Sequence, residues 1–466
     1  MEVTLKQLHE IVGGRLRLAT LAPRHGENGR IGRVVVDSRQ VQAGDVFWGL
    51  PGSTFNGGEF AGEALARGAQ GVVVGKRYVQ PAPRSWALEV DDAQQALFRL
   101  AAWNRQRFAG RVVAVTGSVG KTTTRQMIRA VLERAYAGIS SPKNYNNHVG
   151  VPLSMLAMDT RHEFAVLELA ASAGGEIGRL AELCQPQIGV ITRIGDAHLG
   201  GFGSLDAVAA AKTELLAALP ADGVAVLAGD DQRLRRAAMG CQSKIVWFGR
   251  SLENDLVGTN VESHDGRLMF DVDGTHMSVA VWGRHYLSSA LAAVAVGRLF
   301  GMRDAEISRG LADFEPPPMR CQIMKVGGAT IIDDSYNASP VAMRAALELL
   351  RDISAPGRRI VVCGDMRELG EAAAPLHRNL GDQVVTLCGA DMLVACGEHG
   401  GDVVAGARAA GMPASRAVAV DGIESLFEHC QELVQPGDVV LVKGSRALAL
   451  ERLVEMLGER EALTAH

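Results

Sequence analysis

Short runs of β-branched residues alternate with longer helical patterns along almost the whole chain. Examples are RVVAVTG at 111–117, which precedes a helical run from Arg125, and RRIVVCGD at 358–365. This alternation predicts parallel sheets whose strands are joined by crossover helices. We therefore expect an α/β protein, and 466 residues are enough for about three domains.

Two segments interrupt the alternation and are candidate domain boundaries. The first, VQPAPRSW at 79–86, is polar and contains proline, and a helical pattern, DDAQQALF, starts shortly after it. The second is Glu315 with the three prolines that follow it. Consecutive prolines cannot continue a helix or a central strand, so they favour a semi-rigid linker. We expect domains at 1–88, 89–315 and 316–466.

Composition excludes several classes of protein. The formal net charge is -4, which argues against binding nucleic acid through phosphate neutralisation. No apolar run approaches the roughly 20 residues that span a bilayer, and the first residues lack a signal-peptide core. The seven cysteines are odd in number and scattered, without a C-x-x-C pair. We expect reduced thiols in a cytoplasmic protein that is not inserted in a membrane.

The strongest local motif is TGSVGKTTT at 116–124, between an apolar strand and a helical run. A glycine turn at a helix N-terminus offers backbone N–H groups to an anion. Lys121 would add a charge for the β- and γ-phosphates, and the Thr122 hydroxyl could bind Mg²⁺. Val115 stands where the usual pattern has its first glycine, so the alternative is a plain turn before a solvated lysine. The predicted nucleotide-binding residues here are Gly117, Ser118, Val119, Gly120, Lys121, Thr122 and Thr123.

Two further polar residues follow apolar strands. Glu168 ends the run FAVLE, and His198 follows the strand of IGVITRIGDAH. Open α/β sheets bind ligands at the carboxyl ends of their strands, which makes a Mg²⁺ site credible. The alternatives are a glutamate that merely enters a loop and a histidine with a structural hydrogen bond.

Lys212 lies in the helical segment SLDAVAAAKTELLAALP, with Ser204 as the expected N-cap. At 100° per residue, Lys212 falls within the apolar stripe that includes Val208 and Leu215. A lysine there should lose water and have a lowered pKa, and a neutral amine could react with CO₂ to give a metal-binding carbamate. The alternative is a lysine that snorkels from the edge of the stripe.

The segment DDSYNASP at 333–340 ends another apolar strand, and Pro340 is suited to the first turn of a helix. Acidic residues followed by asparagine at a strand end could bind ribose hydroxyls or a base. They are equally ordinary as turn and cap formers, and spacing does not decide between the two.

Taken together and in order, these segments resemble the Mur ligase family, the ATP-dependent amino-acid-adding enzymes of peptidoglycan synthesis. The matching segments are spread over nearly the whole chain. They are Asp37–Arg39, Ala43–Phe47, Thr116–Thr124, Asn144–Asn147, Glu168, Gly195–His198, Ala211–Glu214, Gly283–His285, Asp333–Pro340, Gly364–Met366, His377 and Lys443–Arg446. DDSYNASP favours the members that add D-alanyl-D-alanine, because the D-N-P-R motif of the diamino-acid-adding members is absent.

The resemblance implies a three-domain fold: a small mixed α/β domain, a central P-loop-type ATPase domain with a mostly parallel sheet, and a Rossmann-like domain. It also implies the roles of individual residues. Ser38 and Arg39 would hold the UDP end of a sugar nucleotide, and Asn144, Asn146 and Asn147 its peptide. Glu168, His198, Thr122 and a carbamylated Lys212 would hold metal. Asp334 and Asn337 would reach the nucleoside, and Arg320 and His377 would lie near the phosphates and the closing domain. Ser289 stands where the family commonly has an asparagine near the adenine.

The activity implied is transfer of D-alanyl-D-alanine to UDP-N-acetylmuramoyl-tripeptide by a monomer, with ATP and Mg²⁺. An acyl phosphate would be the intermediate, and ADP and phosphate the by-products. Two alternatives stay open. One is another Mur-type or polyglutamate-adding ligase, and the other is a related ATP-binding protein that does not catalyse ligation.

Overall fold

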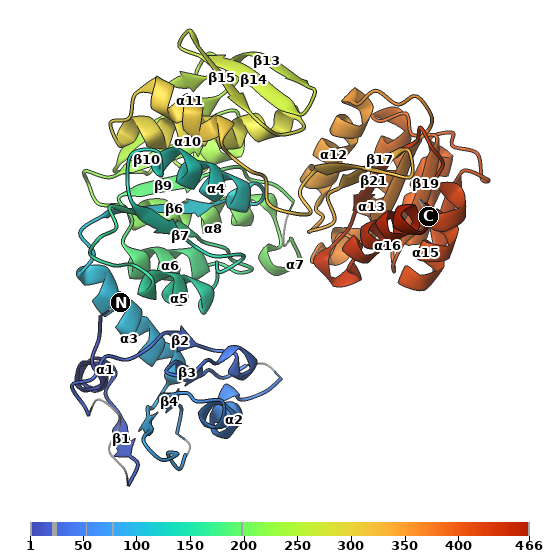
Figure 1. Ribbon diagram of the computed structural model, residues 1–466. Coiled ribbons are helices and arrows are strands. Elements are labelled where there is room, and N and C mark those ends of the chain that lie inside the picture. The colour runs from blue at the N-terminus through green and yellow to red at the C-terminus, as the bar shows by residue number, and fades with distance from the viewer. Residues whose placement is uncertain (1, 21–25, 53, 77–78, 197–198, 465–466) are drawn as a thin grey trace. The chain divides into compact units, whose positions relative to one another are not determined.

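The computed structural model describes residues 2–20, 26–52, 54–76, 79–196 and 199–464 (Figure 1). Their strands form four sheets, of five, seven, three and six strands. The chain divides into two compact units. One comprises Met1–Ala114, Tyr136–Leu169 and Gly178–Gln187, and the other Val115–Ala135, Ala170–Ile177 and Ile188–His466. The boundaries expected at 88/89 and 315/316 stay a prediction.

The five-stranded sheet belongs to the N-terminal region and has the order β1-β5-β4-β3-β2. Strand β1 pairs antiparallel with β5, and the other neighbours are parallel. Phe47, Val72 and Val74 lie in its core. The elements of this region are α1 (Leu5–Val12), β1 (Arg15–Leu18), β2 (Val34–Val35), η1 (Ser38–Gln40), β3 (Val46–Gly49), η2 (Gly57–Phe60), α2 (Ala61–Ala66), β4 (Gly71–Val74), β5 (Trp86–Glu89) and α3 (Ala93–Gln106).

The seven-stranded sheet has the order β12-β11-β10-β9-β6-β8-β7. Strand β9 is parallel to β10 and β7 to β8, as the strand–helix alternation predicted. The elements are β6 (Arg111–Thr116), α4 (Lys121–Leu132), β7 (Gly138–Ser140), α5 (Gly150–Leu156), β8 (Phe164–Glu168), α6 (Glu176–Cys184), β9 (Ile188–Ile191), α7 (Leu199–Phe202), α8 (Leu205–Ala217), β10 (Val224–Ala228), α9 (Gln232–Ala237), β11 (Lys244–Gly249) and β12 (Leu256–Val257).

A three-stranded antiparallel sheet follows, which the sequence analysis did not anticipate. Its strands are β13 (Thr259–His264), β14 (Arg267–Val272) and β15 (Thr275–Val279). After it come η3 (Arg284–Tyr286), α10 (Leu287–Leu299) and α11 (Asp304–Ala312). The predicted linker at Pro316–Pro318 is neither helix nor strand.

The six-stranded sheet has the order β16-β17-β21-β18-β19-β20 and is parallel except for β16. The predicted strand in RRIVVCGD and the predicted apolar strand before DDSYNASP are both present, and a helix begins at Pro340 as expected. The elements are β16 (Gln322–Val326), β17 (Ala329–Asp333), α12 (Pro340–Asp352), β18 (Arg359–Gly364), η4 (Gly370–Ala372), α13 (Ala373–Thr386), β19 (Met392–Cys396), α14 (Gly400–Ala409), β20 (Ala417–Val420), α15 (Gly422–Leu433), β21 (Val439–Lys443), η5 (Arg446–Leu448) and α16 (Glu451–Thr464).

All seven cysteines are free; six are buried, and Cys241 is half-buried. Within the part of the chain that the structure describes, no helix combines the length and the apolar character needed to cross a bilayer.

Candidate active site

The segment Gly117–Gly120 connects β6 to α4, which is the strand–loop–helix arrangement that the motif predicted. Gly117 has a φ of 143°, and a Cβ added there would lie 2.1 Å from Thr192 Oγ1. Gly120 has a φ of 82° and precedes the first residue of α4 without a side-chain cap. The loop therefore needs glycine at both positions, and it leaves the N-terminal N–H groups of α4 without a side-chain acceptor from the capping position.

Groups outside the loop bind its carbonyls and the hydroxyl of Ser118. Thr192 Oγ1 donates to Val119 O at 2.6 Å, and Ser118 Oγ donates to Gly195 O at 3.0 Å. Lys121 Nζ donates to Gly117 O at 2.8 Å and to Ser118 O at 3.1 Å. The ammonium thus lies over the loop, as a phosphate-binding lysine requires, and its role with ATP stays a prediction.

Thr122, predicted to bind Mg²⁺, is the second residue of α4. Its Oγ1 accepts a hydrogen bond from Arg320 Nη2 at 3.3 Å. The Arg320 guanidinium also lies over the ring of Tyr336, 4.3 Å from its centre. The structure therefore brings together two residues predicted separately, Thr122 and Arg320, which are far apart in the sequence.

Helix α4 also contacts α10 through Ser289, the position predicted to lie near adenine. The Ser289 side chain is buried, and its Oγ accepts from Thr124 Oγ1 at 2.9 Å. Thr123 is buried as well. The hydroxyl of Ser289 thus already has a protein partner, and its contact with the base stays a prediction.

Glu168 ends β8 and is 1% exposed. Its Oε1 accepts from Asn146 Nδ2 at 2.8 Å, which joins a predicted metal ligand to a predicted substrate contact. Asn147 Oδ1 accepts from the N–H groups of Val149 and Gly150 at the start of α5. Asn144 is exposed, and its carbonyl accepts from the Asn146 N–H at 2.8 Å. His198 lies outside the described residues.

Lys212 lies on α8, whose N-cap is Ser204 as predicted. It is 1% exposed and shares the buried face with Val208 and Leu215, so the prediction that it lies within the apolar stripe is confirmed. Nζ donates to Ala171 O at 3.3 Å and lies 5.2 Å from the centre of the Phe202 ring.

Burial and then the ammonium of Lys121 lower the pKa of Lys212 from 10.5 to about 7, against opposing contributions from Glu176 and Glu214. At neutral pH a large fraction of its amine is therefore uncharged, which is the form that reacts with CO₂.

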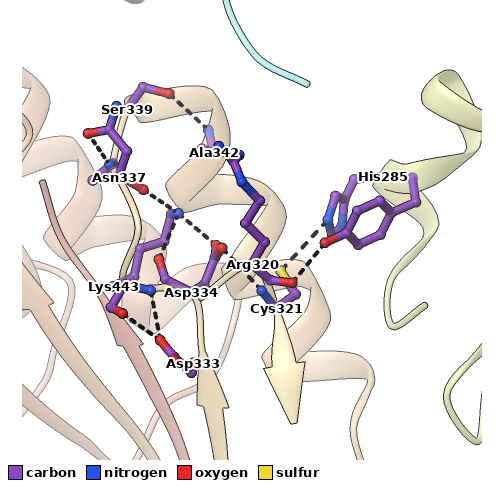
Figure 2. Close-up of polar contacts among 12 residues, drawn as sticks. His285, Arg320, Cys321, Asp333, Asp334, Asn337, Ser339, Ala342 and Lys443 are labelled. Carbon is purple, nitrogen blue, oxygen red and sulfur yellow. Dashed lines mark hydrogen bonds and ion pairs between the residues drawn. The ribbon is translucent and has the colours of Figure 1, made fainter. Parts of the chain in front are cut away.

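The segment after β17 is organised by Lys443, as Figure 2 shows. Lys443 Nζ donates to Asp334 Oδ2 at 2.6 Å and to Asn337 O at 2.8 Å. Asp334 Oδ1 accepts from the N–H of Cys321 at 3.2 Å. Asn337 Oδ1 accepts from the N–H of Ala338. Asp334 and Asn337, the two predicted nucleoside contacts, thus share Lys443 as a partner. The motif Lys443–Arg446 had been quoted without a role for the lysine. A cation at the end of the apolar strand VVLVK was the feature that could have indicated such a role.

His377 is buried on α13, and both of its ring nitrogens bind backbone groups. Nε2 accepts from the N–H of Met366 at 2.9 Å, and Nδ1 donates to Ala373 O at 2.7 Å. Its ring stacks on His399, with centres 4.6 Å apart. Burial lowers the pKa of His377, so the ring is neutral near pH 7. The His377 ring therefore holds the backbone at Met366 in place. Its predicted contact with the substrate stays a prediction.

In the N-terminal region, Ser38 and Arg39 lie on η1, which Asp37 caps. Ser38 Oγ donates to Glu63 Oε2 at 3.0 Å. The Arg39 guanidinium donates to both carboxylate oxygens of Asp37 at 2.9 Å, and its side chain is 79% exposed. An exposed arginine on a short capped turn is accessible to a phosphate.

Residues 115–297 match the Mur ligase middle domain family, and residues 319–446 match the Mur ligase glutamate ligase domain family. The chain is 34% identical to the UDP-N-acetylmuramoyl-tripeptide--D-alanyl-D-alanine ligase of Bacillus subtilis over 98% of each chain. The chain belongs to the Mur ligase family. The enzyme of the same name from Escherichia coli is 32% identical to this Mur ligase, over 98% of the present chain and 99% of the E. coli one.

Solved structures agree with this assignment. A crystal structure of MurF from Acinetobacter baumannii superposes with a TM-score of 0.88 at 29% identity, covering 98% of this Mur ligase and 99% of that chain. MurF ligase from Thermotoga maritima, solved in complex with ADP, has a TM-score of 0.80 at 29% identity, covering 93% and 99%. The expected three-domain α/β fold is confirmed, and this Mur ligase is an ATP-dependent ligase.

Proposed function

We propose that this Mur ligase joins D-alanyl-D-alanine to UDP-N-acetylmuramoyl-tripeptide, with cleavage of ATP to ADP and phosphate. The observation that carries the proposal is the similarity to ligases of that name over 98% of the chain. The segment DDSYNASP also supports D-alanyl-D-alanine, and not a diamino acid, as the amine that accepts the acyl group. A different Mur-type or polyglutamate-adding activity is the main competitor, and a related ATP-binding protein without ligase activity is the second.

ATP is needed because a carboxylate is a poor acyl donor. Transfer of the γ-phosphoryl group to the tripeptide carboxylate gives an acyl phosphate, and the dipeptide amine then displaces phosphate from it. Lys121 and the backbone N–H groups of the 117–120 loop stabilise charge on the transferring group. Arg320, whose guanidinium donates to Thr122, lies beside the first turn of α4, which follows that loop.

Other residues hold the remaining parts of the substrates. Ser38 and Arg39 bind the UDP end of the sugar nucleotide, and Asn144, Asn146 and Asn147 bind its peptide. Asp334, Asn337 and Ser289 contact the nucleoside of ATP, and His377 supports the domain that receives the dipeptide. The proposed enzyme is a cytoplasmic monomer, and light scattering after size-exclusion chromatography tests the monomeric state.

Mg²⁺ is the metal proposed. Thr122, Glu168, His198 and a carbamylated Lys212 would hold it, because hydroxyl, carboxylate and carbamate oxygens suit this ion. Bound Mg²⁺ neutralises charge on the β- and γ-phosphates. Two properties of Lys212 support carbamylation: its burial and its pKa of about 7. A carbamate would replace a poorly solvated cation with a metal-binding anion.

The function is tested by phosphate release from ATP with UDP-N-acetylmuramoyl-tripeptide and a panel of acceptors. D-alanyl-D-alanine should stimulate release, whereas a free diamino acid or glutamate should not. Stimulation by one of those acceptors instead would select the competing ligase activity. Absence of release with every acceptor would favour a protein that binds ATP without ligation.

The carbamate has its own test. Lys212→Ala should lose most activity, and added formate should restore part of it by supplying a carboxylate in the vacated space. Lys212→Arg should be as inactive as Lys212→Ala, because a guanidinium is not carbamylated and stays cationic. Full activity of Lys212→Arg would show that positive charge is sufficient at this position and would disprove the carbamate.

A further inference from the structure

Lys443 is the last residue of β21, and its side chain is 3% exposed. Its ammonium donates to three oxygens: Asp334 Oδ2 at 2.6 Å, Asn337 O at 2.8 Å and Asp334 O at 3.4 Å (Figure 2). An ammonium has three N–H donors, so each has an acceptor. A cation enclosed in this way acts on the segment around it and has no donor left for a substrate.

The 334–337 segment, which Lys443 contacts, is also hydrogen-bonded to Cys321, the residue after Arg320. Asp334 Oδ1 accepts from the N–H of Cys321 at 3.2 Å, while Asp334 Oδ2 accepts from Lys443. Met319 and Cys321 on either side of Arg320 have φ values of 59° and 49°. Non-glycine residues adopt this left-handed conformation at a cost, so the surrounding contacts must hold it. The bond from Cys321 to Asp334 is one of those contacts.

Arg320 connects this arrangement to the phosphate loop. Its carbonyl accepts from Tyr286 Oη at 3.0 Å, and its guanidinium lies 4.3 Å from the centre of the Tyr336 ring. The guanidinium then donates to Thr122 Oγ1 at 3.3 Å. A continuous series of contacts therefore leads from Lys443 through Asp334 and Cys321 to Arg320 and Thr122.

We propose that Lys443 is a positioning residue for nucleotide binding. It shapes the 334–337 segment and, through Asp334, sets the backbone from which Arg320 reaches Thr122. The proposal rests on the proposed function for the binding of ATP at these residues, and it does not depend on which acceptor is ligated. Without the ammonium, the Asp334 carboxylate would lose its cationic partner, and the orientation in which Asp334 Oδ1 accepts from the Cys321 N–H would no longer be fixed.

The same strand offers a matched control at its other end. Asp438, just before β21, forms an ion pair of 2.7 Å with Arg358, and their side chains are 3% and 33% exposed. Asp438 Oδ1 also accepts from the backbone N–H of Arg358. This pair stabilises the same sheet at the amino end of the strand, away from the 334–337 segment. Its loss should lower stability without changing the nucleotide site.

The test is titration of the full chain with ATP and, separately, with the UDP-tripeptide, at a temperature where every variant is folded. Lys443→Met should weaken ATP binding about 10- to 100-fold, the scale expected when a hydrogen bond to a charged group is lost. Binding of the UDP-tripeptide should not change. Arg358→Met should lower the unfolding midpoint and leave ATP binding as in the wild type.

Lys443→Arg keeps a positive charge beside Asp334, so it provides a second test if Lys443→Met does not fold. It should still bind ATP more weakly than the wild type, because a planar guanidinium does not reproduce the geometry of the three acceptors. Wild-type ATP affinity in either Lys443 variant would overturn the proposal. Equal weakening in Arg358→Met would also overturn it, because the effect would then follow from stability alone. Phosphate release with D-alanyl-D-alanine, measured on the wild type, tests the proposed function independently.

Discussion

Two buried lysines in this protein have opposite surroundings. The ammonium of Lys443 donates to three oxygens, whereas among the described residues Ala171 O is the one hydrogen-bond acceptor recorded for Lys212. Burying a charge is costly unless it is paired and hydrogen-bonded. The first lysine is therefore suited to a permanent ion pair, and the second to losing its proton and reacting.

The low pKa of Lys212 predicts a specific dependence of stability on pH. Between pH 7 and 10.5 the amine is neutral in the folded protein and protonated in the unfolded one. The unfolded state then binds more protons, so stability rises with pH by up to about 1.4 kcal/mol per unit. Below about pH 7 both states are protonated, and this dependence disappears.

The measurement compares the wild type with Lys212→Met by urea unfolding in CO₂-free buffers from pH 6 to 9, with the free energy taken from the unfolding transition that includes α8. The difference in unfolding free energy, wild type minus variant, should be flat below pH 7 and increase above it. A difference that stays constant over the whole range would mean that Lys212 titrates normally.

Lys121→Ala should reduce phosphate release by about 10²- to 10³-fold, the scale for removing one preorganised donor from a transition state. The variant should stay folded, because Lys121 is partly exposed and two of its partners are carbonyls of the loop. Lys244→Ala, at an exposed position that starts β11, is the control and should keep full activity. Near-normal turnover of Lys121→Ala would remove this residue from the mechanism.

The sequence predicted the burial of Lys212 but not the role of Lys443, for a physical reason. Helical periodicity is a local property, so the stripe that contains Lys212 can be read within one segment. The partners of Lys443 lie more than 100 residues away and depend on β17 and β21 being neighbours. The bond between Thr124 and Ser289 likewise joins residues 165 positions apart. Such contacts follow from strand order and helix packing, which a single motif does not contain.

At the scale of the element, the turn into α4 depends on backbone conformation. Gly120 has a φ of 82°, and the nearest atom to a Cβ added there would be Ser289 Oγ at 3.7 Å, an ordinary contact. Gly120→Ala should therefore cost about 1–2 kcal/mol through the left-handed conformation alone. The same turn orients the N-terminal N–H groups of α4 toward the proposed phosphate site, so the rate of ATP turnover should fall as well.

Gly301 provides the control for this prediction. Its φ is 79°, and an added Cβ would meet nothing within 4 Å, at a turn that follows α10. Gly301→Ala should lose a similar amount of stability, measured as the unfolding midpoint, but keep its rate of phosphate release. Equal losses of activity in the two variants would argue against a specific role for the turn at Gly120.

Whole elements differed in how well the sequence predicted them. Ser204 and Pro340 are the N-cap and first residue of their helices as expected, because capping chemistry acts within a few residues. The antiparallel sheet β13–β15 was missed. Its strands bury one face only, as in the alternating exposure of Arg267–Val272, so they lack the continuous β-branched runs of the parallel strands.

At the scale of the whole molecule, the N-terminal and C-terminal sheets each have a hydrophobic core of their own. A protein with separate cores should not unfold as a single two-state unit. Differential scanning calorimetry should show more than one transition. ADP at about 100 times its Kd should stabilise the segments that bind it, the 117–124 and 334–337 segments, by about 2.7 kcal/mol, and leave the transition of the N-terminal sheet unchanged. A single transition that ADP shifts as a whole would contradict this expectation.

The seven free thiols act as a set of built-in chemical reporters. Thiolates, not thiols, react with alkylating reagents, and burial raises the pKa of Cys184, Cys363 and Cys430 to about 12. In the folded protein the half-buried Cys241 is therefore the accessible target. Each buried cysteine becomes reactive only when its own segment opens. Brief alkylation at increasing urea, read by peptide mass, would therefore record the order in which α6, the region around Cys321 and the C-terminal sheet unfold, with no engineered label.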